Sequence, residues 1–231
     1  MTIDYLRTLP YLTFKDTQID KIQKYIDFTL EENKKYDLTA NDDFDSFLIK
    51  NVVDSLLIAQ FYDFNNQSVI DIGSGAGLPG ILLAIYFDKG EFTLVEPMLK
   101  RVNFLNKVVE LLDLKNVKVV RARAEDYIKE SKAKYDYSVS RAVAKTNIMI
   151  ELSVPFLKVG GSLICYKGIG AKEELQDAKN AIKELKCEYS NIHEARLDSS
   201  NDYRAFLEFK KLEKSPVKYP RLFKDIKKRP L

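Results

Sequence analysis

The chain has 231 residues, enough to bury one core but few for two independent catalytic domains. Hydrophobic residues make up 45% and charged residues 31% of it, which excludes an intrinsically disordered chain. No run reaches the roughly 18 apolar residues of a membrane-spanning helix, and the first residues lack an export signal. Cys165 and Cys187 have neither paired-thiol nor metal-ligand spacing, so we expect a cytoplasmic protein with free thiols and no metal.

The net charge of +3 is unevenly distributed along the chain. Residues 1–66 carry 7 basic and 12 acidic side chains, residues 67–209 carry 21 and 20, and residues 210–231 carry 9 and 2. A basic end of this density attracts a polyanion through counterion release, although solvated basic tails are also common.

The first 66 residues show helical periodicity. Apolar residues recur three and four apart from about Asp16 to Glu32 and again from about Asp43 to Tyr62. We therefore expect residues 1–66 to form a helical extension that packs on the core.

From Ser68 on, short apolar runs alternate with amphipathic segments, as in βαβ units around a parallel sheet. The pattern predicts strands at 68–72, 91–95, 117–121, 135–140 and 161–166, and helices near 79–87, 98–112, 125–131, 146–157 and 172–186. Two more strands, 187–196 and 202–210, are joined by the turn Asp198-Ser199-Ser200-Asn201 and must be antiparallel. Residues 67–211 therefore have the layout of a class I methyltransferase, a Rossmann-like α/β fold. Residues 212–231 hold three prolines among basic residues and are expected to be an extended tail.

A glycine loop follows the first predicted strand. In the run from Asp71 to Gly80, the glycines Gly73, Gly75 and Gly77 precede Leu78 and let the backbone approach a nucleoside-containing cofactor. The pattern also fits a dinucleotide-binding loop. Asp71 suits the amino group of S-adenosylmethionine, and Glu96 after the second strand can accept both ribose hydroxyls. Both acids could instead be merely polar strand ends.

Two further loops lie at the carboxyl ends of predicted strands. Ala124 and Glu125 follow Arg123 after the third strand, where a methyltransferase binds adenine, although acids also favour a helix N-terminus. Arg141 ends the fourth strand at the edge where open α/β folds bind ligands.

The fourth strand ends without an Asn-Pro-Pro-Tyr or Pro-Cys motif, which disfavours methylation of exocyclic amines and covalent attack on a pyrimidine. Guanine N7 has an in-plane lone pair and no proton to lose, so its methylation needs only orientation of the base. Arg141 and Arg123 are candidates to orient it, through O6 or the RNA backbone.

Several motifs occur in order: Tyr36-Asp37-Leu38-Thr39-Ala40, Asp54-Ser55-Leu56, the loop 71–80, Lys100-Arg101, Arg123-Ala124-Glu125, Ser140-Arg141-Ala142, Lys167-Gly168, Tyr219-Pro220-Arg221 and Arg229-Pro230-Leu231. Together they resemble the bacterial 16S ribosomal RNA guanine-N7 methyltransferase family, also called glucose-inhibited division protein B.

The resemblance implies transfer of a methyl group from S-adenosylmethionine to N7 of one guanine of 16S rRNA. The sequence leaves open whether the substrate is free RNA, a partly assembled particle or the mature small subunit. The resemblance also implies cofactor contacts at Gly73, Leu78, Glu96, Ala124, Glu125 and Arg141. By charge and position, the RNA-facing set is Lys100, Arg101, Arg123, Lys167 and Arg221, and a monomer is the simplest expectation. The chain departs from the family at Asn51, where a histidine is common, and at 223–226, where a glycine-containing stretch is usual.

Three other functions remain open at this point. A methyltransferase for small molecules or proteins is disfavoured by the basic tail, and a nicotinamide-dependent oxidoreductase by the terminal hairpin. A non-catalytic RNA-binding module would keep the basic face without binding the cofactor.

Overall fold

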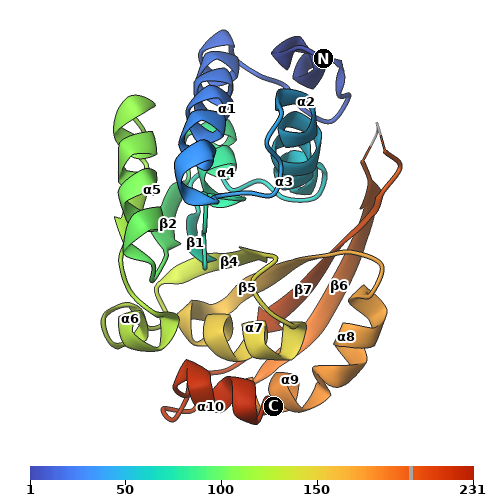
Figure 1. Ribbon diagram of the computed structural model, residues 1–231. Helices are drawn as coiled ribbons and strands as arrows, with labels where there is room; N and C mark the ends of the chain where they lie inside the picture. The colour runs from blue at the N-terminus through green and yellow to red at the C-terminus, as the bar shows by residue number, and fades with distance from the viewer. Residues whose placement is uncertain (198–199) are drawn as a thin grey trace.

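A computed structural model describes residues 1–197 and 200–231. Its centre is one seven-stranded sheet in the order β3-β2-β1-β4-β5-β7-β6 (Figure 1). The strands are β1 (Ser68–Ile72), β2 (Glu91–Val95), β3 (Val117–Val120), β4 (Tyr135–Arg141), β5 (Leu157–Lys167), β6 (Cys187–Arg196) and β7 (Tyr203–Lys211). Strands β1 to β5 pair in parallel, and β7 pairs antiparallel with both β5 and β6. The predicted sheet is confirmed, while Asp198 and Ser199 of the predicted turn lie outside the described residues.

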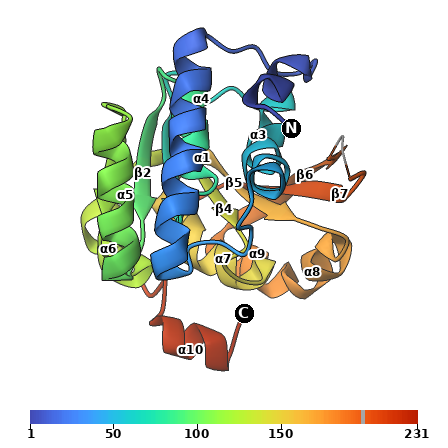
Figure 2. The same cartoon turned by 45° about the horizontal axis from the view of Figure 1, so that its top comes forward.

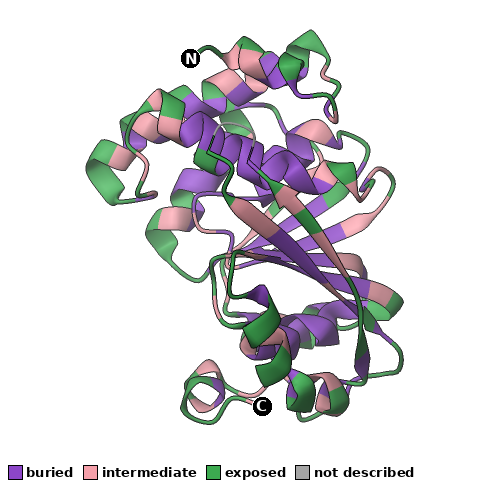
Figure 3. Ribbon diagram, turned by 90° about the vertical axis from the view of Figure 1, so that its right-hand side faces the viewer, coloured by how far each residue is buried: buried purple, intermediate pink, exposed green. Residues whose placement is uncertain are grey.

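Helices cover both faces of the sheet (Figures 1 and 2). One layer holds α1 (Asp16–Tyr36), α4 (Gly80–Tyr86) and α5 (Leu99–Leu111), and the other holds α6 (Ala124–Ser131), α7 (Thr146–Ser153), α8 (Ala171–Asp177) and α9 (Lys179–Leu185). Each layer buries its own apolar cluster against the sheet, whose central strands are the most buried part of Figure 3. Within residues 1–197 and 200–231, no helix is long and apolar enough to cross a membrane.

The prediction of one continuous helix from Asp43 to Tyr62 is wrong. The segment consists of α2 (Phe44–Phe47), the π-helical η2 (Leu48–Val53), α3 (Asp54–Leu56) and the 3₁₀-helical η3 (Leu57–Gln60). A π-helical turn takes more residues than an α-helical turn and is common at functional sites. Here the Lys50 carbonyl in η2 accepts a hydrogen bond at 3.0 Å from the distant Arg141 side chain. Apolar periodicity carries no information about such a contact.

Two other predicted helices differ in the structure. The helix expected at 146–157 stops at Ser153, and after η4 (Val154–Phe156) strand β5 begins at Leu157, four residues before the prediction. Within this strand Gly160 has φ 88°, a conformation that glycine adopts without steric cost. The helix expected at 172–186 is divided at Ala178 into α8 and α9.

The C-terminal segment is not an extended tail, which corrects the sequence expectation. Its residues 223–228 form α10 (Phe223–Lys228), and Ile226 is fully buried. Before it, Arg221 donates to both carboxylate oxygens of the fully buried Glu151, at 2.8 and 2.6 Å. A buried carboxylate needs such a bidentate partner, so this contact fixes the segment against α7.

Helix α1, which belongs to the N-terminal extension, contacts the glycine loop. The hydroxyl of Tyr25 donates to the Ala76 carbonyl at 2.6 Å, and the Tyr25 side chain is fully buried. The extension thus holds the loop that follows β1.

We expect Tyr25→Phe to lower the free energy of unfolding by about 1–3 kcal/mol, because the buried Ala76 carbonyl loses its donor. Urea denaturation measures the change. Tyr36→Phe, at an exposed tyrosine of the same helix, is the control. Equal stability of the two variants would contradict the role given to Tyr25.

Candidate functional site

The candidate site lies where the order of the strands reverses. Strands β2 and β3 continue the sheet on one side of β1, and β4 and β5 continue it on the other. Ligands of open α/β folds bind in the crevice at such a point, outside the carboxyl ends of the strands. A cavity of about 370 Å³, here named the loop cavity, lies there. It is lined by Leu38, Thr39, Asn51, Gly73, Ser74, Gly75, Ala76, Leu78, Glu96, Pro97, Met98, Arg101, Arg141, Ala142 and Val143.

The glycine loop and Glu96 form one hydrogen-bonded wall of the loop cavity. Gly73 has φ 76°, and a Cβ there would lie 2.8 Å from Cγ2 of Val143. The Glu96 carboxylate accepts from the backbone N–H of Gly75 at 3.0 Å and of Met98 at 2.9 Å. Each carboxylate oxygen has a second lone pair, so Glu96 can still accept a hydroxyl from a ligand.

Asp71 and Gly77 line neither this cavity nor the apolar cavity described below. Asp71 is buried beneath the loop, where its Oδ2 accepts from the N–H of Gly80 at 3.0 Å. Its Oδ1 has no hydrogen-bond partner among the described residues. Burial raises the pKa of this carboxyl to about 7, although the Gly80 N–H opposes the shift. Asp71 therefore supports the loop from below in this structure.

The raised pKa of Asp71 predicts a pH-dependent stability. Because the folded state holds the proton more tightly than the unfolded chain, the free energy of unfolding falls as the pH rises from about 4 to about 7. Asp71→Asn, which stays neutral, should lack this part of the pH dependence. Urea denaturation of the wild type and of Asp71→Asn from about pH 4 to about pH 7 measures the difference. If the free energy of unfolding changed with pH in the same way in both proteins, Asp71 would not be the group responsible.

A second, smaller cavity of about 100 Å³, the apolar cavity, adjoins the loop cavity at Gly73, Pro97 and Val143. It is lined further by Ile72, Val95, Ala122, Arg123, Ala124, Glu125, Leu152 and Phe223. The Glu125 carboxylate accepts the backbone N–H of Phe223 at 3.0 Å. A largely apolar space lined by an acid and an aromatic side chain suits an adenine base, so the two cavities together fit S-adenosylmethionine.

The apolar cavity predicts that the C-terminal segment contributes to cofactor affinity. Phe223→Ala should weaken binding of S-adenosylmethionine about fivefold or more, since contacts between a base and an aromatic ring are worth about 1–3 kcal/mol. Isothermal titration calorimetry gives the Kd. Val217→Ala, at a 91% exposed position of the same segment, should leave it unchanged. An unaltered Kd in Phe223→Ala would exclude this contribution.

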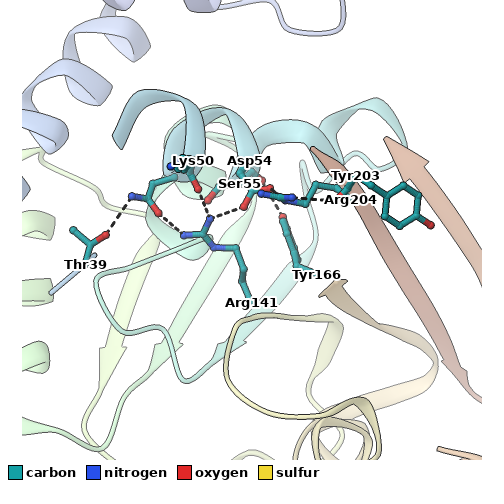
Figure 4. A network of polar contacts seen from close by, with 9 residues as sticks. Thr39, Lys50, Asp54, Ser55, Arg141, Tyr166, Tyr203 and Arg204 are labelled. Atoms are coloured by element: carbon teal, nitrogen blue, oxygen red, sulfur yellow. Dashed lines mark hydrogen bonds and ion pairs between the residues drawn. The ribbon is translucent and has the colours of Figure 1, made fainter. Parts of the chain in front are cut away.

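Arg141 is held by a polar network from three distant segments (Figure 4). Its Nη1 donates to Oδ2 of Asp54 at 2.8 Å, and its Nη2 donates to Oδ1 of Asn51 at 3.0 Å. The other oxygen of Asp54 accepts from Nε of Arg204 in β7 at 2.5 Å. Asn51 in turn donates to Oγ1 of Thr39 at 3.3 Å. The guanidinium of Arg141 thus has a fixed orientation at the end of β4.

Arg141, Ala142 and Val143, here named the shared wall, line both the loop cavity and a neighbouring cavity of about 390 Å³, here named the charged cavity. The charged cavity is also lined by the charged residues Asp54, Lys145, Lys167, Glu174 and Arg204 and by Ala144, Tyr166, Gly168 and Phe206. Four of its side chains are cationic and two are anionic. A polar ligand that carries negative charge can enter it beside whatever occupies the loop cavity.

The five residues expected to face RNA have different surroundings. Lys100 and Arg123 are exposed, and Arg101 lines the loop cavity. Lys167 pairs with Glu174 at 2.7 Å in the charged cavity, and the guanidinium of Arg221 pairs with Glu151. Arg123 also lines an open cavity of about 510 Å³ with Lys224 and Lys227 of α10.

The structure adds residues to which the sequence analysis gave no role. Thr39, Asn51 and Asp54 come from motifs of the extension, while Arg204, Glu174 and Phe223 come from the last third of the chain. The first three lay in or beside the quoted motifs Tyr36-Asp37-Leu38-Thr39-Ala40 and Asp54-Ser55-Leu56, which were a usable signal. The other three had no local signal, because only the fold brings them to the sheet edge.

Comparison with known proteins agrees with this geometry. Residues 18–201 match the model of the GidB family, described as rRNA small subunit methyltransferase G. Curated relatives named Ribosomal RNA small subunit methyltransferase G include that of Thermotoga petrophila, 44% identical over 95% of this chain and 94% of the relative. The relative from Mesoplasma florum is 39% identical over 90% of this chain and 88% of its own length.

Solved structures with the same fold are more distant in sequence. M. jannaschii TYW2 in complex with AdoMet has a TM-score of 0.57 at 19% identity and covers 70% of this chain and 76% of its own. A SAM-dependent methyltransferase from Aquifex aeolicus has a TM-score of 0.57 at 17% identity and covers 78% of this chain and 97% of its own. These likenesses confirm the predicted class I methyltransferase fold.

Proposed function

We propose, from the premise that this chain belongs to the GidB family of rRNA small subunit methyltransferases, that it transfers the methyl group of S-adenosylmethionine to N7 of one guanine in 16S rRNA. The observation that carries the proposal is the shared wall at Arg141, which puts a charged cavity directly beside a cavity that fits the methyl donor.

We assign the two halves of the cofactor to the two adjoining cavities. Glu96 would accept the ribose hydroxyls in the loop cavity, with Gly73, Gly75 and Leu78 against the methionine part. Ala124, Glu125 and Phe223 would hold adenine in the apolar cavity. When bound, S-adenosylmethionine supplies an electrophilic methyl group on a sulfonium.

The reaction requires the protein only to orient the guanine base toward the methyl group. Guanine N7 carries an in-plane lone pair and no proton, so no residue has to act as a general base. Arg141 is fixed by Asp54 and Asn51 between the two cavities, and Nε of Arg141 makes no hydrogen bond with another described residue. That N–H can donate to O6 of the base and leave N7 open to attack.

We further propose that the substrate is bound through its phosphates. Arg101 lines the loop cavity, Arg123 lines the apolar cavity, and the exposed Lys100 directly precedes Arg101. Lys224 and Lys227 of α10 share a further cavity with Arg123 and add to these cations. We propose that the protein acts as a monomer. A ribosomal substrate supports a cytoplasmic site of action.

The test uses labelled S-adenosylmethionine and small ribosomal subunits from cells that lack this enzyme. We expect one labelled guanine, located by strand scission specific for N7-methylguanine. Gly73→Ala should lower affinity for S-adenosylmethionine about tenfold, because the residue has a positive φ and its Cβ would meet Val143.

Gly170→Ala is the matched control. Its Cβ would meet no atom within 4 Å and its φ is not positive, so cofactor binding and methyl transfer should stay at the wild-type level. Cofactor binding without transfer to the subunits would reject the substrate and point to a small molecule or protein. Absence of cofactor binding would reject methyl transfer altogether.

A further inference from the structure

The charged cavity has the composition of a base-recognition pocket. It shares Arg141, Ala142 and Val143 with the cofactor cavities, and Lys167, Gly168 and Glu174 also line it. A purine whose N7 faces the shared residues still has its adjacent Watson–Crick edge available to the other residues of the cavity. Enzymes that modify a base commonly read an extruded base through its Watson–Crick edge in such a pocket.

N7 itself cannot identify guanine, because adenine has the same ring nitrogen. Besides O6, guanine differs at its Watson–Crick edge, where N1–H and N2–H₂ are donors, while adenine offers an acceptor at N1. A carboxylate accepts hydrogen bonds and donates none, so it attracts the guanine edge and repels N1 of adenine. The pocket needs one carboxylate with an available oxygen.

Glu174 meets this requirement better than Asp54. Each oxygen of Asp54 is already paired with an arginine, Arg141 or Arg204, so two cations compensate its charge. Oε2 of Glu174 accepts from the backbone N–H of Thr146 at 2.7 Å, from its hydroxyl at 2.8 Å and from Nζ of Lys167 at 2.7 Å. Oε1 of Glu174 accepts no hydrogen bond from another described residue, and the side chain is 28% exposed.

The contacts of Oε2 also keep the Glu174 side chain charged and oriented. Burial alone would raise the pKa of this carboxyl, but hydrogen bonds from Lys167 and Thr146 outweigh it and lower the pKa. With Oε2 anchored, Oε1 is the oxygen of this cavity-lining residue that stays available as an acceptor. We propose that the charged cavity binds the target guanine and that Glu174 is the residue that selects it, through N1–H and N2–H₂. This inference rests on the proposed methylation of guanine N7.

The test is a double-mutant cycle between Glu174 and the N2 amino group. Small subunits are reconstituted from 16S transcripts that carry guanosine or inosine at the methylated position, since inosine lacks only the N2 amino group. With wild-type enzyme, kcat/KM should be about tenfold lower on inosine, because one hydrogen bond to a charged acceptor is lost.

In Glu174→Ala the difference between guanosine and inosine should fall to less than about twofold. Glu173→Ala, at an exposed neighbour on the same helix that lines no part of the cavity, should keep the wild-type difference. The Kd of S-adenosylmethionine should be unchanged in both variants.

A merely structural role of Glu174, through Thr146 and Lys167, would lower activity on both substrates and leave their ratio at the wild-type value, which would overturn the proposal. Equal rates of wild-type enzyme on guanosine and inosine would overturn it without any variant, even if Glu174→Ala failed to fold. No transfer by wild-type enzyme to guanosine subunits would instead reject the proposed function.

Discussion

The ion pair between Arg141 and Asp54 is the contact on which the candidate site depends. Both side chains are largely withdrawn from solvent, with exposed fractions of 14% and 9%. Removing one partner would leave the other charge buried and unpaired, which costs about 3–5 kcal/mol in comparable pairs. The pair joins β4 to α3 and, through Arg204, to strand β7. Arg141 also donates to the Lys50 carbonyl in the π-helical turn η2. This network therefore fixes the position of Arg141 between the loop cavity and the charged cavity.

The N-terminal extension is consequently part of the site and not an accessory to it. Tyr25 fixes the glycine loop at Ala76, and Thr39 and Asn51 complete the line of hydrogen bonds to Arg141. Asn51 departs from the histidine expected by the resemblance, but its amide serves both neighbours at once. It accepts from Arg141 through its oxygen and donates to Thr39 through its nitrogen. Asn51 can therefore hold Arg141 although it stands in place of the expected histidine.

The sequence predicted the sheet well because its strands are short apolar runs with clear breaks, and β1, β2 and β6 have the expected bounds. It also placed the glycine loop, Glu96 and Arg141 at one edge, since parallel strands share the direction of their carboxyl ends. It could not assign the contacts of Arg221 or Phe223, because a short amphipathic turn among basic residues and prolines resembles a solvated tail. The depth of Asp71 was likewise invisible, since burial is a property of the whole fold.

The arrangement separates two tasks that methylation of a ring nitrogen requires. In the proposed arrangement, backbone turns, Glu96 and apolar surfaces hold the donor, although Arg101, Arg123 and Arg141 also line its two cavities. The acceptor base would lie among the cations of the charged cavity, where the RNA phosphates also need to be neutralised. Arg141 is the cation common to the loop cavity and the charged cavity, and its ion pair with Asp54 compensates its charge. Without that compensation, the arginine that orients the base would also repel the cofactor, so the position of Asp54 reconciles the two requirements.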